Sequence, residues 1–150
     1  MRFAWLLVTT LGMVAPQIAH ASLGGTVDTI TTDQSKMSVR MHAVANSGAG
    51  NRHTLTLTNG GEVREYTNAA GTVYAVRWTG PGKPDLDTLL GVHFATMQSD
   101  NPASARRGMR RPPGVDRTDL KIVTGGHAGA FWGYAWLPLL TPSGFDPSSL

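Results

Sequence analysis

The sequence predicts an α+β domain: an antiparallel β-sheet of about five to six strands with one amphipathic helix packed on one face, in the order β-β-β-β-α-β-β. Two observations predict this class. Residues 53–79 contain short runs with alternating apolar residues, separated by tight-turn signals, which is typical of an antiparallel meander. After residue 84 the apolar residues recur at helical spacing, and a single amphipathic helix buries its stripe best against a sheet face.

The meander begins where Leu55 and Leu57 alternate with threonines. Asn59-Gly60 follows and favours a hairpin, because both residues tolerate positive φ. The third strand is apolar on both faces, so we expect it in the centre of the sheet. Its predicted faces are Tyr74, Val76 and Trp78 on one side, and Val73 and Ala75 on the other. The expected strands are 36–44, 53–58, 62–67, 72–79, 119–124 and 131–137, with Gly125-Gly126 as the last turn.

The helix is predicted from Asp85 to about residue 100, with Asp85 and Asp87 in its first turn, where carboxylates favour the helix dipole. Gly91 weakens it by roughly 1 kcal/mol relative to alanine and is expected to let it approach the sheet closely. The apolar stripe consists of Leu86, Leu89, Leu90, Phe94 and Met97, with His93 beside it.

Residues 1–21 have the pattern of a secretory signal peptide: Arg2, an apolar run, Pro16, and small residues before a cleavage site between Ala21 and Ser22. The apolar run is too short for a stable membrane span, although an uncleaved anchor is the alternative. The chain has no cysteine, so a lipoprotein is excluded and no disulfide is expected. We therefore expect a periplasmic or secreted protein that uses the general secretory route.

Cleavage would leave about 130 residues, a common size for one domain. We expect residues 22–52 to form an extended N-terminal segment with a possible edge strand. Residues 53–140 form the predicted α+β domain, and residues 141–150 an irregular C-terminal tail. No stable membrane span is expected after cleavage.

No catalytic or metal-binding constellation is apparent. The histidines lack ligand spacing, and no serine lies in a strained G-x-S-x-G turn. We therefore predict no enzyme activity, no metal and no cofactor. The alternative is a hydrolase or other enzyme with a site near His127, which follows two glycines.

Three aromatic residues, Trp132, Tyr134 and Trp136, share one face of the last predicted strand. We interpret them as core beneath the helix, because large aromatic side chains stabilise a core strongly. The alternative is an exposed platform that, together with His127, binds a glycan, a peptide or a lipid edge.

The one charge cluster consists of Arg106, Arg107, Arg110 and Arg111, within a loop at residues 103–114. A solvated loop is the simpler interpretation; the alternative is an anion site for lipid headgroups, lipopolysaccharide or an acidic partner. The sequence pI is about 9.7, but the formal net charge is only +3 and export is expected, so we do not predict nucleic-acid binding.

Several ordered motifs of this chain resemble the domain-of-unknown-function 2844 family. They are Ser22-Leu23-Gly24-Gly25, Arg64-Glu65-Tyr66, the stretches 71–81 and 84–91, Gly125-Gly126-His127 and Ala135-Trp136-Leu137-Pro138. The resemblance covers most of the predicted mature chain and implies an exported proteobacterial protein with a single domain. It implies no activity and transfers no catalytic residue.

The sequence therefore predicts a non-enzymatic periplasmic or envelope domain for binding or assembly. The expected partner is an envelope component, whether protein, glycan or anionic lipid, and the oligomeric state stays open.

Overall fold

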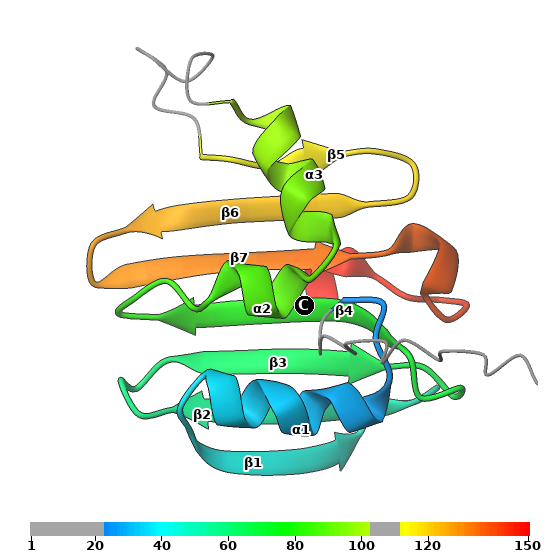
Figure 1. The fold of residues 1–150 in the computed structure, drawn as a ribbon. Coiled ribbons are helices and arrows are strands. Elements are labelled where there is room, and N and C mark those ends of the chain that lie inside the picture. Colours follow the sequence, from blue (N-terminus) through cyan, green and yellow to red (C-terminus); the bar gives the residue numbers. More distant parts are fainter. Residues whose placement is uncertain (1–22, 103–111) are drawn as a thin grey trace, which may run out of the picture.

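A computed structural model describes residues 23–102 and 112–150. The predicted signal peptide, the Ala21–Ser22 cleavage site and the four arginines 106, 107, 110 and 111 lie outside the described residues. Seven strands form one antiparallel sheet in the order β1-β2-β3-β4-β7-β6-β5 (Figure 1). The strands are β1 (Val39–Asn46), β2 (Asn51–Leu57), β3 (Glu62–Thr67), β4 (Val73–Gly80), β5 (Val115–Asp116), β6 (Lys121–His127) and β7 (Ala130–Trp136).

Three helices lie on one face of this sheet, α1 over the β1–β3 end and α2 and α3 over the remaining strands (Figure 1). They are α1 (Val27–Lys36), α2 (Leu86–Leu90) and α3 (His93–Asp100). Two 3-10 turns, η1 (Pro138–Leu140) and η2 (Pro147–Ser149), follow β7. No helix within the described ranges is long and apolar enough to cross a membrane. The predicted α+β class with an antiparallel sheet is confirmed, but the number and order of its elements differ from the prediction.

Helix α1 replaces the extended segment that the sequence predicted before the edge strand. Its buried residues are Thr29, Ile30 and Asp33, so two of the three side chains facing the sheet are polar. An inner face of this composition does not read as an apolar stripe. The sequence pattern alone therefore does not predict α1, and the helix becomes evident only from its packing on the sheet.

The single predicted helix is two helices, separated at Gly91, which adopts φ 52° and ψ −127°. The αR conformation cannot continue through such a residue, and glycine adopts it without a Cβ penalty. Asp85 caps α2, as its side chain accepts bonds from the backbone N–H groups of Asp87 and Thr88. A seventh strand, β5, pairs with β6 through only two residues, too few to show an alternating pattern.

A β-bulge in β4 changes the predicted faces of the central strand. Tyr66 pairs with Ala75 and Thr67 with Val73, so Tyr74 has no partner in β3. As a result the alternation was wrong for two residues: Val73, not Tyr74, lies on the same side as Val76 and Trp78, and Tyr74 lies on the side of Ala75. It packs with Tyr66 on the side of the sheet away from the helices, where a bulge commonly re-aims a side chain.

The main core fills the space between the helices and the sheet. It includes Ile30 of α1, Leu89 and Leu90 of α2, and Val76 and Trp78 of β4, all at most 3% exposed. Trp78 lies directly over Gly133, its partner on β7. A Cβ at Gly133 would lie 2.2 Å from the Trp78 ring, so this indole packs against the bare backbone of the neighbouring strand.

Replacing Gly133 by alanine should therefore lower the free energy of unfolding by about 1–3 kcal/mol, because the added methyl group displaces a buried indole. Chemical denaturation of the two proteins measures this difference. Gly82→Ala is the matched control: a Cβ there meets only Asn59, at an ordinary 3.5 Å, and the change should be small. Equal losses for the two variants would contradict the packing described here.

Candidate functional site

The sheet face away from the helices carries a row of aromatic side chains along β7. Ala135 and Leu137 belong to the helix-side core, so the alternate residues Trp132, Tyr134 and Trp136 point to the opposite side. The rings of Trp132 and Tyr134 stack at a centroid distance of 6.3 Å, and those of Tyr134 and Trp136 at 5.8 Å. We call these three residues the aromatic row. The expectation that they form core beneath the helix is wrong, because the helices cover the other face.

Gly125 allows the first residue of the row to lie against β6. It pairs with Trp132, and a Cβ added to Gly125 would lie 2.3 Å from the Trp132 ring. The sequence placed a turn at Gly125-Gly126, whereas both residues belong to β6 and the turn follows at Ala128 and Gly129. Here the missing side chain provides room for an indole.

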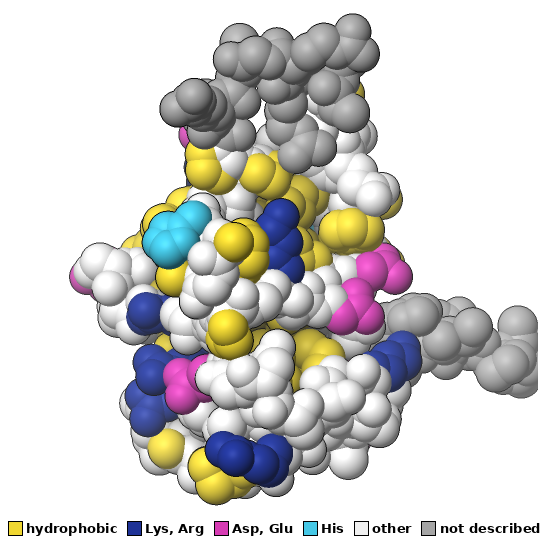
Figure 2. All heavy atoms as spheres, turned by 90° about the vertical axis from the view of Figure 1, so that its left-hand side faces the viewer, with side chains coloured by type: hydrophobic (Ala, Val, Ile, Leu, Met, Phe, Trp, Pro, Cys, Tyr) yellow, Lys and Arg dark blue, Asp and Glu magenta, His cyan; other side chains and the backbone are white. Residues whose placement is uncertain are grey.

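His127 lies at the hairpin end of the same strand pair, opposite Ala130. It is exposed, and its Nδ1 lies 2.9 Å from the carbonyl oxygen of Ala128. Figure 2 looks at this end of the sheet, where a histidine and basic side chains lie among hydrophobic ones. In the part of the chain that the structure describes, no carboxylate or hydroxyl group hydrogen-bonds to His127. The arrangement that would make it a general base is therefore not formed there.

The C-terminal tail covers the other end of the aromatic row. Leu150 is buried with Tyr66 and Tyr74, and Phe145 packs edge-on against Tyr74 at 5.3 Å between ring centroids. Arg77 donates a hydrogen bond from its guanidinium to the main-chain oxygen of Leu150. Tyr134 and Trp136 pack against this cluster and are half-buried, whereas Trp132 is 44% exposed. The row is thus covered at one end and open at the other.

Basic side chains border the row, and each has an acceptor. Arg77 lies directly opposite Tyr134 in the sheet, and Arg64 lies opposite Arg77. Arg64 forms an ion pair with Glu62 at 2.6 Å, and Lys121 pairs with Asp116. Two of the three cations are thus paired with a carboxylate, and the third, Arg77, with the main-chain oxygen of Leu150.

A cluster of three buried polar side chains, which the sequence pattern did not predict, lies on the opposite side of the sheet beneath α1. Asp33, His53 and Glu65 are at most 5% exposed, and both oxygens of each carboxyl group, together with His53 Nε2, are buried without a hydrogen-bond partner. We call these three residues the buried polar cluster. Alternation was the available signal: His53 is two residues before the inward Leu55 and Glu65 is two residues after the inward Val63, so each shares the inner face of its strand.

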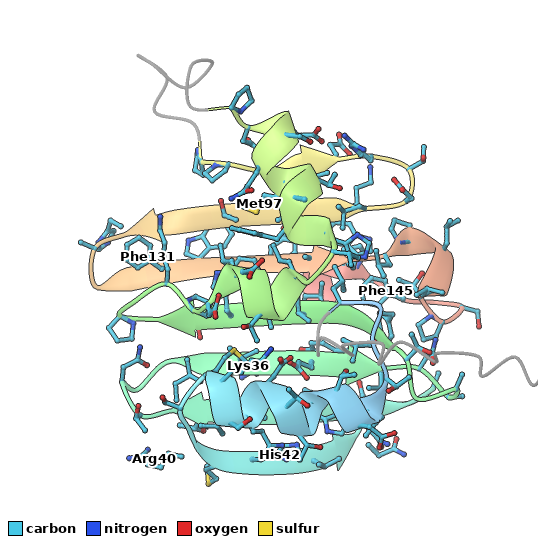
Figure 3. All side chains as sticks on the ribbon, viewed as in Figure 1. Lys36, Arg40, His42, Met97, Phe131 and Phe145 are labelled. Carbon is cyan, nitrogen blue, oxygen red and sulfur yellow. The ribbon has the colours of Figure 1, made fainter. Side chains whose placement is uncertain are left out.

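A chain of contacts connects this cluster to the edge of the sheet. His42 on β1 stacks on His53, with its Nε2 3.1 Å from His53 Nδ1. Gln34 of α1 in turn places its amide 2.7 Å from His42 Nδ1. Figure 3 shows His42 on β1 alongside α1. Among the residues described, no three histidine or acidic side chains come together so as to hold a metal ion.

Burial dominates the electrostatics of the cluster. It raises the pKa of Asp33 to about 8, helped by nearby Glu65 and Asp85 and opposed by Lys36. Burial also raises the pKa of Glu65 to about 7. The pKa of His53 is lowered by burial and by the neighbouring His42. The interior thus favours the neutral form of all three groups.

Comparison with known proteins identifies the family of the chain. No curated protein and no solved structure matches it. The family described as "Protein of unknown function (DUF2844)" matches residues 19–150, which include the aromatic row, the C-terminal tail and the buried polar cluster. The resemblance seen in the sequence motifs is thereby confirmed, and the chain belongs to the DUF2844 family.

Proposed function

We propose that this protein is a non-enzymatic binding or assembly domain of the bacterial cell envelope, and that the helix-free face of its sheet binds a partner polypeptide. One observation carries the proposal. The tail of the chain already packs on this face through Phe145 and Leu150, and it leaves Trp132, at the other end of the aromatic row, exposed.

The composition of the surface supports a protein partner. Tryptophan, tyrosine and arginine are the residues that most often carry the binding energy of protein interfaces. Here Trp132, Tyr134 and Arg77 lie side by side on β7 and β4, held by stacking and by sheet pairing. A rigid surface of this kind loses little conformational entropy on binding.

The contacts of the tail indicate a polypeptide rather than a lipid or a glycan. Arg77 binds a main-chain oxygen, and Tyr74 takes an aromatic side chain edge-on. Two of the three cations around the row, Arg64 and Lys121, are already paired with Glu62 and Asp116, which weakens attraction to an anionic lipid or acidic glycan. The partner that fits this face is a peptide segment with aliphatic or aromatic side chains and with carbonyl groups free to accept hydrogen bonds.

The alternative, a hydrolase or other enzyme near His127, has no support in the geometry of the described residues. His127 is exposed at a hairpin end, and its one hydrogen bond within the described residues is to the carbonyl group of Ala128. We therefore place His127 at the border of the binding face and assign it no catalytic role.

The proposed partner can be tested by photo-crosslinking in the producing cell. A photoreactive residue at Thr79, directly opposite Trp132, should give protein adducts, and Trp132→Ala should reduce their yield by about tenfold or more, as expected for a central interface aromatic. Gel analysis of the adducts before and after protease treatment measures both effects.

Val92 provides the matched controls, since it is 78% exposed on the helix side. A photoreactive residue placed there should give few adducts, and Val92→Ala should leave the yield at Thr79 unchanged. Equal yields from the two positions, yields insensitive to Trp132→Ala, or adducts that survive protease would contradict a polypeptide partner on this face.

The envelope location rests on the signal-peptide pattern of residues 1–21, and it predicts a defined mature form. Protein recovered from the periplasm or the medium should begin at Ser22. N-terminal sequencing checks this, with an Ala19→Lys, Ala21→Lys variant expected to block cleavage. Recovery of the intact chain from the cytosol would refute the proposed location.

A further inference from the structure

The buried polar cluster joins α1 to the sheet through groups that repel each other when charged. Asp33 comes from the inner face of α1 and Glu65 from β3, and they are 0% and 1% exposed. None of their four carboxyl oxygens has a hydrogen-bond partner. The helix therefore docks with one buried acid close enough to a second for their charges to interact.

Such an arrangement is stable only while the acids are neutral. An ionised carboxylate without donors is very costly in an apolar interior, and two nearby negative charges add repulsion. The charged and titratable groups that face the pair are few. Lys36 of α1 and Asp85 at the start of α2 act on Asp33, His53 is the partner of Glu65 across β2 and β3, and His42 acts on His53.

The two ends of α1 are fixed by the buried residues that flank it, Leu23 and Met37. Between these ends, Ile30 is the one large buried aliphatic side chain of the helix, beside Thr29 and Asp33. Its N-cap residue, Thr26, makes no side-chain capping bond. A ten-residue helix with one large apolar side chain between its fixed ends has little stability of its own. The free energy of a charge change in its contact with the sheet is therefore large compared with the free energy that keeps the helix docked.

We propose that Asp33 and Glu65 form a proton-controlled latch that fastens α1 to the sheet. With both carboxyl groups neutral α1 stays docked. When protons are lost, α1 leaves the sheet and uncovers the inner face of β2 and β3. This device lies on the face opposite the aromatic row and does not depend on the proposed polypeptide partner.

The direction of the pH effect follows from proton linkage. Free carboxyl groups ionise near pH 4, whereas the docked pKa values are about 8 for Asp33 and about 7 for Glu65. Between these limits the released form binds fewer protons, so docking weakens as the pH rises and levels off above about pH 8. His53, whose pKa is lowered, opposes this trend only below about pH 6.5.

Amide hydrogen exchange of the full chain between pH 6.5 and 8.5 tests the latch. After correction for the intrinsic exchange rate, the opening constant of residues 27–36 should rise by about tenfold to a hundredfold over this range. Strands β4 and β7 should change much less. Asp33→Asn, which keeps the shape and removes the charge, should reduce this rise strongly, and Glu65→Gln should reduce it in part.

Asp28→Asn is the matched control, because Asp28 lies on the same helix but is exposed, and the wild-type pH dependence should persist. Glu65→Gln provides an independent measurement if Asp33→Asn does not fold. The proposal would be overturned if the opening constant of the wild-type chain did not change with pH. It would also be overturned if the Asp33→Asn and Glu65→Gln variants both showed the full wild-type rise.

Discussion

The packing of Trp78 on Gly133 determines how the two faces of the sheet are used. The indole of β4 occupies the place where a side chain of β7 would stand, and it belongs to the core under the helices. Because Gly133 faces that core, its neighbours Trp132 and Tyr134 point to the other side. At this point of the central strand pair, one glycine therefore lets Trp78 of β4 fill the helix side while Trp132 and Tyr134 of β7 lie on the opposite face.

The two faces consequently differ in chemistry. The helix side is covered by three short helices and encloses two acids whose carboxyl oxygens have no hydrogen-bond partner, beside the buried His53. The open side has stacked aromatic rings, paired cations and a tail that covers part of them. Large exposed apolar patches commonly mark interaction sites, whereas burial shifts the pKa of acids. The proposed binding face and the proposed latch thus lie on opposite faces of one sheet.

The sequence predicted those elements whose residues repeat with a clear period. The meander of β2, β3 and β4 was found from Leu55, Leu57 and the Asn59-Gly60 turn, and the residues of the aromatic row were identified as neighbours on one face. The prediction failed where a polar residue interrupts the pattern. Asp33 interrupts the apolar pattern on the inner face of α1, and the bulge at Tyr74 exchanges the predicted faces of Val73 and Tyr74. The buried polar cluster was missed because each of its members, taken alone, looks like a surface residue.

The sequence by itself determined the class of the fold, the family, and which residues alternate along each strand, because periodicity and turn chemistry are local properties of the chain. Only the tertiary structure decided which face the helices cover and that Asp33 meets Glu65 beneath α1. The reason is physical: alternation separates the two sides of a strand but does not say which side is covered. That choice depends on packing between segments far apart in the chain, such as Trp78 against Gly133 and Leu150 against Tyr74.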